Sequence, residues 1–493
     1  MSKFIQNILK PAALALSGLL ALASPAAATE LEIKTGFDVF TSPTAQLTSF
    51  HYVTGAVDLG NGFYFGQSIY SSATGYRGGL FVGGIEAYKR FNLTERTAID
   101  LGAFLGGGGG AELIYGDGLM ARLNASVVHA ITPNLKGSLG VSWIAIKDAP
   151  VAGPAISAGV VVPLHMAVSG GFTDHKPANG TVIAAIKPFA RSYITINSTR
   201  RWSTRPVDNM YLVGAELTFR AEPGARREVF VRLAGAMAGD GEGYAEIQAG
   251  PRWYTKGEWV RGFFDVGLGL SGGGEVDTGG GLIGTASLGI SANLWPGLGV
   301  EAGIGGVKSF TGNFQAATVF ARSVINLDDP RAHAKGGLWA SRRWQMSTGL
   351  HYSFEHPGLR RPPPRGPLGG NPVLYESSLD LFFGKHFYVF GSGLTAVWGD
   401  VGGYAIGAVG VGYELPIGDR FAVAVEGFAG AGAGGGINTN GGLIYGGRVE
   451  ADYALNKNLK LNVGAGRYFS RGPASPWFVQ AGLKIPFTSH HGR

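Results

Sequence analysis

The chain is built from long runs in which apolar and polar residues alternate. In the run at 442–455, one face is apolar and carries Leu443, Tyr445, Gly447, Val449, Ala451, Tyr453 and Leu455. The opposite face is mostly polar and carries Ile444, Gly446, Arg448, Glu450, Asp452 and Ala454. A period of two is typical of a β-strand with one apolar and one polar side. The run is longer than the usual strand of about 5–6 residues, and it reaches the roughly 9–11 residues that a tilted strand needs to cross a bilayer.

Runs of this kind return at a nearly fixed spacing along the chain. Leu119, Leu282 and Leu443 each open one, directly after a glycine-rich stretch, and they are 163 and 161 residues apart. Three copies of about 162 residues therefore fill nearly the whole chain, and such a unit is far longer than the ~20–50 residues of a solenoid repeat. We predict a signal segment followed by three domain-sized repeats, with these boundaries: 1–28, 29–184, 185–342 and 343–493.

Each copy is predicted to contain about eight strands. In the third copy the runs are 346–355, 373–385, 387–398, 402–416, 420–433, 442–455, 459–469 and 477–487. The connections alternate between short turns, such as 456–458, and longer glycine-rich loops, such as 431–442. An even number of strands with short turns on one side and longer loops on the other is the layout of outer-membrane barrels. The sequence therefore predicts an all-β fold, a transmembrane antiparallel β-barrel built from three tandem repeats.

The strand count allows either one barrel of about 24 strands or three barrels of eight. Eight strands close around an interior that side chains just fill, and 24 strands lie within the known range. The segments between copies, 165–187 and 328–345, are longer than the turns on the same side, which favours separate units. Many polar-face positions are Gly, Ser or Thr, however, and these residues fill space poorly. We therefore predict a single barrel of about 24 strands with a wide lumen.

The composition suits a surface that meets lipid. Charged residues are 15% of the chain and hydrophobic residues 45%, whereas soluble proteins have about 25% charged residues. Aromatic residues near predicted strand ends suit interfacial girdles; they are Tyr88, Phe91, Trp253, Tyr254, Tyr413, Trp295 and Tyr468. The alternative is a secreted all-β repeat protein, which predicts shorter strands packed around an apolar core.

The N-terminal segment is predicted to be an export signal. Lys3 and Lys10 make the start of the segment positively charged, and a short apolar stretch follows at 11–23. Ala26 to Ala28 then offer a small-residue cleavage site. The chain has no cysteine, which excludes disulfides and thiolate metal sites. We expect the outer membrane of a Gram-negative bacterium as the destination, reached after signal-peptide-directed export.

The end of the last predicted strand carries a family signal. Gln480-Ala481-Gly482-Leu483-Lys484-Ile485-Pro486-Phe487 places a polar residue, then glycine, then hydrophobics before a final aromatic. This segment resembles the closing strand of bacterial outer-membrane barrels. The resemblance implies an outer-membrane barrel that contacts membrane lipid, lipopolysaccharide and the barrel assembly machinery. The chain departs from the pattern in its six further residues and in Pro486, which restricts that position to an edge-like or terminal site.

One pair of residues could carry enzymatic chemistry. His351-Tyr352-Ser353 resembles the His-x-Ser pair of outer-membrane lipid A deacylases, which implies His351 as base and Ser353 as nucleophile. The alternation, however, places both residues on the polar face, away from a lipid substrate. We therefore predict no enzyme, and keep a lipid A deacylase-like hydrolase as a minor alternative.

Basic residues form the main candidate site. Those on polar strand faces are predicted to line the lumen together with two acids: Arg122, Arg322, Arg448, Glu450, Asp452 and Lys484. Others lie in long loops: Arg200, Arg201, Arg205, Arg360, Arg361 and Arg365. Cationic linings and mouths attract anions, and loop arginines can equally bind lipopolysaccharide phosphates or be plain solvated residues.

Other polar clusters carry no chemistry in this interpretation. The glycine runs, such as 106–110, lack the lysine and hydroxyl of a phosphate loop and more plausibly allow tight turns or close backbone packing. The loop acids at 240–242 and 275–277 are too few to hold Ca²⁺, which takes six to eight oxygens. We predict no metal, no cofactor and no nucleic-acid partner.

The function predicted first is a pore or export conduit with a mild preference for anionic solutes or polymers, polysaccharide included. The alternative is a non-conducting structural or adhesive surface protein made of three closed barrels. If Glu450 faces a wide lumen and Val449 faces lipid, Glu450→Arg is expected to be tolerated and Val449→Arg to impair assembly.

Overall fold

The computed structural model describes residues 31–490, apart from 45–46, 111–116, 148, 165–166, 173–181, 202, 222–224, 328–340, 355–358 and 360–369. The predicted signal peptide lies outside the described residues. In the described part of the chain, every regular secondary-structure element is a β-strand. A search of those residues for a helix long and apolar enough to span a bilayer found none.

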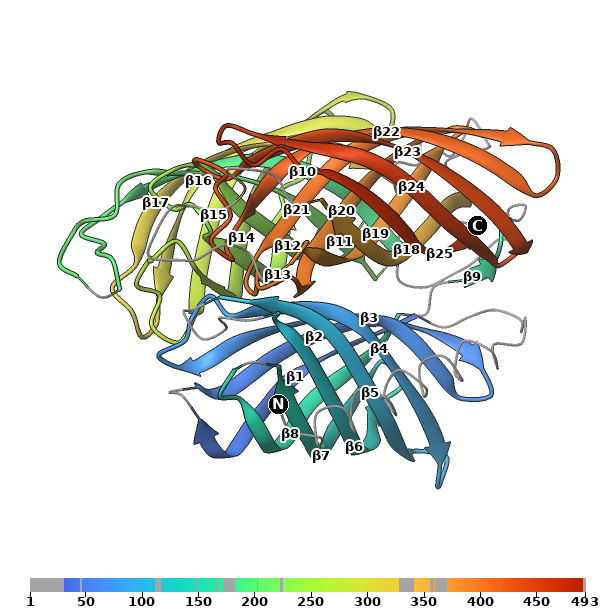
Figure 1. Cartoon of the computed structure of the whole chain (residues 1–493), viewed down its shortest axis with the longest axis horizontal. Helices are drawn as coiled ribbons and strands as arrows, with labels where there is room; N and C mark the ends of the chain where they lie inside the picture. The colour runs from blue at the N-terminus through green and yellow to red at the C-terminus, as the bar shows by residue number, and fades with distance from the viewer. Residues whose placement is uncertain are drawn as a thin grey trace.

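The strands form three closed antiparallel sheets, here called barrels 1, 2 and 3 (Figure 1). Barrel 1 consists of β1 (Leu31–Thr44), β2 (Leu47–Gly60), β3 (Phe63–Gly75), β4 (Phe81–Asn92), β5 (Thr97–Gly109), β6 (Leu119–Thr132), β7 (Leu135–Ile146) and β8 (Ala152–Leu164). Barrel 2 consists of β10 (Val182–Thr195), β11 (Met210–Arg220), β12 (Arg227–Gly239), β13 (Ala245–Tyr254), β14 (Val260–Gly272), β15 (Leu282–Trp295), β16 (Leu298–Ser309) and β17 (Gln315–Asn326). Barrel 3 consists of β18 (Ser341–Ser353), β19 (Val373–Phe383), β20 (Phe387–Trp398), β21 (Ala405–Ile417), β22 (Phe421–Ala433), β23 (Leu443–Asn456), β24 (Leu459–Ser470) and β25 (Trp477–His490).

The all-β barrel prediction is confirmed, but the preferred single barrel of about 24 strands is wrong. The eighth strand of each copy returns to its own first strand: β8 pairs with β1, β17 with β10, and β25 with β18. The strand ranges predicted for the third copy differ from the observed ones by only a few residues at each end.

The single-barrel prediction was wrong because it assumed that glycines on the inner face leave space unfilled. In the structure, an aromatic ring on a neighbouring strand lies over such a glycine. The ring of Phe263 covers Gly289, and the ring of Phe478 covers Gly466, so closely that a Cβ added to either glycine would clash. Rings over glycines and long charged side chains together fill an interior that eight strands can enclose.

The short strand β9 (Ala167–Gly170) follows barrel 1 in sequence but pairs with barrel 3. Its backbone runs antiparallel to the end of β25, from Phe487 to His490. The pairing of β25 with β24 ends at Lys484, so Pro486 lies beyond that ladder, and its carbonyl accepts a hydrogen bond from the amide of Gly171 at 2.9 Å. Pro486 is therefore at an edge, as its missing N–H requires, and the residues after Phe487 extend the strand that β9 covers.

The predicted orientation of the alternating residues is confirmed. On β23, Tyr445 and Val449 are about half exposed, at 47% and 53%, whereas Arg448, Glu450 and Asp452 are buried. The girdle prediction is only partly right. Phe91, Trp253, Trp295 and Tyr413 face outward, but the other three aromatic residues are buried and face inward because they follow the polar phase of their strands: Tyr88, Tyr254 and Tyr468.

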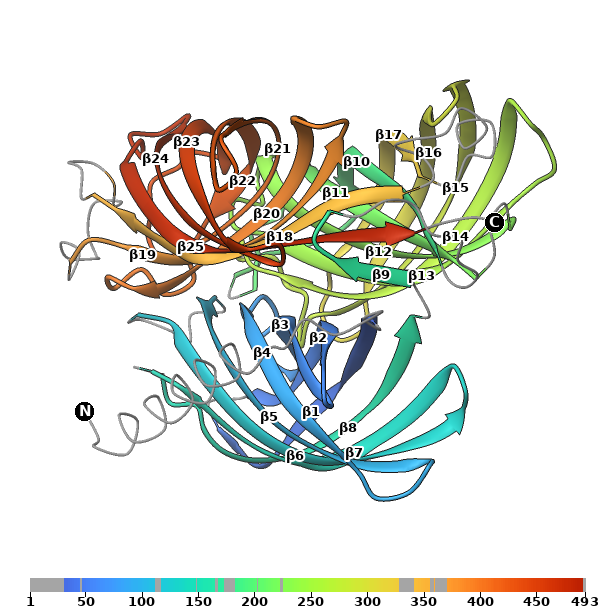
Figure 2. The ribbon, with the colours of Figure 1, turned by 90° about the vertical axis from the view of Figure 1, so that its right-hand side faces the viewer.

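The three barrels lie against one another in a cyclic order (Figure 2). The fifth strand of each barrel approaches the third strand of another: β5 approaches β20, β22 approaches β12, and β14 approaches β3. The glycine-rich loops make the closest approaches. Gly79 of barrel 1 lies against the backbone of Gly272, and Gly109 lies against the backbone of Gly403, with no room for a Cβ. These glycines allow neighbouring barrels to pack backbone against backbone.

Candidate functional site

The interior of each barrel has two layers. Next to the longer loops lies an apolar layer, which in barrel 2 includes Tyr193, Tyr244, Ile283 and Phe314. Equivalent apolar clusters lie in barrels 1 and 3. Beyond this layer, toward the short turns, the inward side chains are charged and almost all are paired. The charged layers are the candidate site because they gather most of the inward ionisable chemistry of the molecule.

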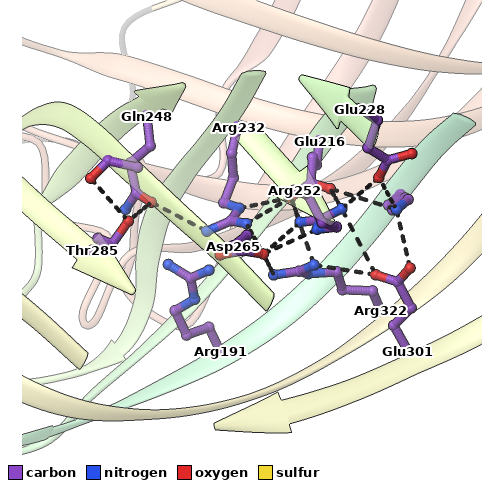
Figure 3. Close-up of polar contacts among 12 residues, drawn as sticks. Arg191, Glu216, Glu228, Arg232, Gln248, Arg252, Asp265, Thr285, Glu301 and Arg322 are labelled. Carbon is purple, nitrogen blue, oxygen red and sulfur yellow. Dashed lines mark hydrogen bonds and ion pairs between the residues drawn. The ribbon is translucent and has the colours of Figure 1, made fainter. Parts of the chain in front are cut away.

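Barrel 2 contains the densest network (Figure 3). Arg252 on β13 lies at its centre and contacts Glu216 at 2.5 Å, Asp265 at 2.8 Å and Glu228 at 3.0 Å. Arg232 adds a second contact to Glu216 at 2.8 Å. The side chains come from β11, β12, β13 and β14, and each occupies the inward phase of its strand. Arg252, Arg232, Glu216 and Asp265 are fully buried.

A second part of this network links Lys187 on β10 to the far wall. Its ammonium group contacts Glu228 at 2.9 Å and Glu301 at 3.0 Å. Arg322 contacts the other oxygen of Glu301 at 3.1 Å. The Tyr254 hydroxyl lies between the same two glutamates and completes a connection across the barrel.

Barrel 1 holds two smaller groups of ion pairs. Arg90 contacts Glu32 at 2.9 Å and Asp100 at 2.8 Å, and Lys34 contacts Asp100 at 2.9 Å. Further toward the long loops, Arg122 contacts Asp38 at 2.8 Å. A stacked pair of tyrosines, Tyr64 and Tyr88, packs beside Arg90.

Barrel 3 is centred on Arg448. This guanidinium contacts Glu426 at 2.5 Å, Glu376 at 2.8 Å and Glu450 at 3.0 Å. Lys484 contacts Glu450 at 2.5 Å and Asp452 at 3.1 Å.

The three interiors differ in charge balance. Among the described buried side chains, barrel 2 holds six basic groups and five carboxylates: Lys187, Arg191, Arg220, Arg232, Arg252 and Arg322 against Glu216, Glu228, Glu246, Asp265 and Glu301. Barrel 3 holds three basic groups and six carboxylates, with the less buried Lys460 as a further cation: Arg342, Arg448 and Lys484 against Glu376, Asp380, Glu414, Glu426, Glu450 and Asp452. The interior of barrel 1 holds three basic groups and four carboxylates: Lys34, Arg90 and Arg122 against Glu32, Asp38, Glu86 and Asp100. The buried pair of Lys147 and Asp117 lies in the loops next to barrel 3.

The structure places the six predicted lumen residues inside the barrels and pairs every one of them. Arg122 lies in barrel 1, Arg322 in barrel 2 and the other four in barrel 3: Arg448, Glu450, Asp452 and Lys484. They do not form one site. Because Glu450 is 1% exposed and contacts both Arg448 and Lys484, the expectation that Glu450→Arg is tolerated is wrong: the change would place three cations together.

The six predicted loop arginines differ in their surroundings. Arg200 is held between two acids that the sequence placed in separate solvated loops, Asp240 at 2.5 Å and Glu275 at 2.8 Å. Arg201 donates to the carbonyl of Gly279 at 3.1 Å. Arg205 is exposed. The remaining three predicted loop residues, Arg360, Arg361 and Arg365, lie outside the described residues.

His351 is arranged as a structural residue. One ring nitrogen lies 2.8 Å from the Tyr468 hydroxyl and the other 2.6 Å from a Glu376 oxygen. Both nitrogens are therefore engaged, and neither is left to accept a proton from Ser353. Both residues are buried inside barrel 3, on the face predicted from the alternation.

Two loop carboxylates join neighbouring barrels. Asp117 of barrel 1 accepts a hydrogen bond from the amide of Gly399 in barrel 3 at 3.0 Å and pairs with Lys147. Glu242 of barrel 2 accepts from the Thr439 hydroxyl at 2.7 Å and from the amide of Gly441 at 3.0 Å, both in barrel 3.

Sequence reasoning missed the largest group of ion-paired residues, including Glu216, Arg232 and Arg252. The signal was available, because these residues fall on the polar phase of 210–220, 227–239 and 245–254. Comparing those phases across strands would have placed all three on one inner surface.

Comparisons with known proteins add only a general likeness. No protein-family model matches the chain, and no curated protein matches it. Among solved structures, the outer membrane protein opdK from Pseudomonas aeruginosa has 11% identity and a TM-score of 0.24, covering 94% of this chain and 99% of that one. The copper transporter OprC has 9% identity and a TM-score of 0.30, covering 93% and 81%. A bacterial polysaccharide outer membrane secretin has 8% identity and a TM-score of 0.24, covering 94% and 98%. At such scores the likeness carries no argument about function, and the barrel architecture rests on the strand pairing.

Proposed function

We propose that this chain is an outer-membrane β-barrel protein in which three sealed barrels span the bilayer as one joined unit and present their interlocked loops at the surface. The observation that carries the proposal is the inverted polarity of each barrel, with apolar side chains outside and ion pairs inside. A water-soluble barrel would show the opposite arrangement, because exposed contiguous apolar surface in water is unfavourable.

The apolar outer surface is continuous from strand to strand. On barrel 3, Val411, Val425, Val449 and Val463 lie on four successive strands, and each is between 50% and 58% exposed. Val425 and Val449 are direct cross-strand partners. Barrel 2 carries a similar outward set: Leu268, Leu288, Ile290 and Ile304. Strands of 10 to 14 residues are long enough to cross a bilayer when tilted.

The filled interiors favour a non-conducting role over a pore. Eight strands leave room for side chains alone, and the central residues Arg252 and Arg448 are 0% and 6% exposed. The joined loops of three barrels offer a larger surface than any one barrel would. A structural or adhesive surface function therefore fits the geometry best.

Single-cysteine labelling tests the membrane assignment, since the native chain has no cysteine. Cysteines at Tyr445, Val449 and Tyr453 should react with membrane-soluble probes and not with charged thiol reagents in intact outer membranes. Cysteine at Arg205 should react with charged reagents. Equal labelling of all four positions by the charged reagent would place this surface in water and exclude the proposal.

Pore formation, the function predicted first from the sequence, is a second candidate. The charged layers inside the barrels support it, because an ion path would open if pairs such as Lys187 with Glu301 separated and water entered. The five arginines among the described buried residues of barrel 2 would then favour the passage of anions. Recording from planar bilayers decides between the two functions: the sealed structure predicts no steps under conditions in which a general porin conducts, whereas steady anion-selective steps would establish the pore.

Binding of lipopolysaccharide is part of the same proposal. Arg205 is the exposed basic residue of the loop at 196–209 and is available to a lipid phosphate. Arg205→Ala should reduce the lipopolysaccharide that co-purifies with the protein, whereas Arg200→Ala should mainly loosen its own loop.

A further inference from the structure

We propose that residues 167–172 form a releasable strap that closes the short-turn mouth of barrel 3, so that water and small solutes reach the charged layer of this barrel only when the strap lifts. The strap consists of β9 and the two residues that follow it, and it belongs to the linker between barrels 1 and 2. The inference goes beyond the proposed function, because it concerns access to one barrel interior and holds whether or not the chain conducts.

The backbone of the strap covers an edge that the rest of barrel 3 leaves unpaired. The last strand, β25, pairs with β18 as far as His490, but its pairing with β24 ends at Lys484. On that side β9 pairs with β25 from Phe487 to His490, and the Gly171 amide donates to the Pro486 carbonyl at 2.9 Å. Figure 1 shows β9 beside the end of β25. Among the described strands, β9 alone is added to a barrel that closes without it.

The side chain of Phe172 lies across the mouth itself. Its ring centroid is 5.2 Å from that of Phe382, a buried residue on the inward face of β19. Two cationic groups lie over the Phe172 ring: the Arg343 Cζ on β18 is 5.5 Å from its centroid, and the Lys460 Nζ on β24 is 5.9 Å from it. The three contacts come from the short-turn ends of their strands, and only β25 separates β24 from β18 in the barrel. Phe172 therefore bridges one arc of the rim, from β19 to β24.

The charged layer of barrel 3 begins directly inside this mouth. Lys460, which lies over the Phe172 ring, contacts Glu414 at 3.0 Å and is 3.9 Å from Asp452. Lys484 contacts the same Asp452 oxygen at 3.1 Å and continues the layer inward. The apolar layer lies between these groups and the long loops. The strap therefore covers the end of the barrel at which the charged groups are nearest to solution.

The strap fits the rim closely. Gly171 has a φ of +73°, and a Cβ on it would lie 2.8 Å from the Lys457 carbonyl oxygen in the turn between β23 and β24. A Cβ on Gly170 would lie 2.7 Å from the Asn458 Oδ1 atom of the same turn. The two glycines therefore allow the backbone to pass close to this turn before Phe172 enters the mouth.

Few interactions hold the strap, and none of them is needed to close the barrel. β9 pairs with β25 over four residues, whereas β18 pairs with β25 over thirteen. Outside this ladder, the Thr488 hydroxyl donates to the Gly171 carbonyl at 2.9 Å. A short edge pairing opens at a small part of the free energy that unfolds the whole structure. The strap can therefore leave while barrel 3 stays closed.

Cysteine accessibility on the full chain in detergent tests the closure. The native chain has no cysteine, and Asn462→Cys places one on the inward face of β24, one inward position beyond Lys460. This cysteine should react slowly with a small water-soluble thiol reagent, and roughly tenfold faster once Phe172→Ala removes the burial of the ring. Ser291→Cys, on the inward face of β15 in barrel 2, is the matched control and should not respond to Phe172→Ala. Phe310→Ala, which removes an exposed ring from a long loop, should change neither rate.

Two further variants separate release of the strap from damage to the barrel. Gly171→Ala keeps the Phe172 ring but forces the backbone away from the turn, and it should also speed the labelling of Asn462→Cys. In a separate chain without that change, cysteines at the paired positions Val168 and Ser489 form a disulfide that holds the strap. Hydrogen exchange of the Gly171 amide should then slow, and it should return to the native rate on reduction.

Two results would overturn the proposal. One is an Asn462→Cys that reacts at the same rate with and without the Phe172 ring. The other is a Gly171 amide that exchanges in the native chain as slowly as the amides between β24 and β25, because the strap would then be a permanent part of the barrel. Should Asn462→Cys fail to fold, the exchange measurement on the native chain decides alone.

Discussion

Barrels 2 and 3 are built to the same plan and filled in opposite ways. Both have eight strands, the same order of short turns and long loops, and an apolar layer above a charged one. Barrel 2 distributes three carboxylates around Arg252, and barrel 3 distributes three around Arg448. Among the described buried side chains, six of the eleven charged ones in barrel 2 are basic, whereas six of the nine in barrel 3 are carboxylates. The alternation and the turns therefore determine the barrel, and the interior is free to vary as long as buried charges find partners.

The largest effect is expected from removing the central cation of the acidic barrel. Arg448→Met leaves Glu376, Glu426 and Glu450 without their common partner, which should cost about 3–5 kcal/mol. Arg322→Met in barrel 2 should cost less than half as much, because Glu301 keeps Lys187 at 3.0 Å and the Tyr254 hydroxyl at 2.8 Å. Hydrogen exchange of the amides in each barrel measures both changes separately. Equal losses would mean that charge balance does not distinguish the two interiors.

Substitutions on the outer surfaces of barrels 2 and 3 should have equal effects on folding. The difference between the two barrels would then be confined to their interiors. Leu288 on β15 and Val449 on β23 hold equivalent positions 161 residues apart and are 57% and 53% exposed. Arginine at either position, near the middle of its strand, should cost about 2–4 kcal/mol in a membrane. The measurement is the fraction that folds into lipid vesicles. Trp295→Arg, at a strand end, is the control and should cost at most about 1 kcal/mol; a cost independent of depth would contradict a membrane-spanning barrel.

Contact between the two barrels depends on small side chains. Gly235 on β12 faces Ala431 on β22, and a Cβ at Gly235 would lie 3.2 Å from the alanine methyl group. Gly235→Leu should therefore separate barrels 2 and 3 locally, at about 1–3 kcal/mol. Gly393→Leu is matched to it, because Gly393 is also on a third strand but faces open space. Faster hydrogen exchange in β12 and β22 for the first variant alone is the expected outcome, and equal exchange in both would remove the packing role.

The smallest effect concerns the loop carboxylate that reaches from barrel 2 to barrel 3. Glu242→Gln exchanges two charge-assisted hydrogen bonds for neutral ones and should cost about 1 kcal/mol. The Gly441 amide, which donates to Glu242 at 3.0 Å, should exchange several-fold faster. Glu275→Gln, which affects a pair within barrel 2 only, should leave that amide unchanged.

The positions of the strands, and which side chains point inward or outward, could be predicted because both follow from local sequence patterns. The period of two on 442–455 gave the inward position of Arg448 and the outward position of Val449, and both hold in the structure. Turn residues set the strand ends. Neither the alternation nor the turn residues depend on which strands pair. Predictions made from them therefore hold although the number of barrels was predicted wrongly.

The closure of each barrel and the partners of its charged side chains could not be predicted from local patterns. Both depend on contacts between residues that are far apart in the sequence. Whether Ala155 on β8 meets Phe40 on β1 is decided by how well one interior fills, and the glycines that suggested a wide lumen are covered by rings from other strands. The partners of Arg200, 40 and 75 residues away, were hidden for the same reason.

The continuous chain through three barrels has a genetic consequence. In an assembly of identical subunits, a substitution appears in every copy at once, so an interior charge that suits one barrel is imposed on all. Here β5, β14 and β22 hold corresponding places in the cyclic packing but are encoded separately. Each barrel can therefore acquire changes in its interior independently while the contacts between the barrels stay in place.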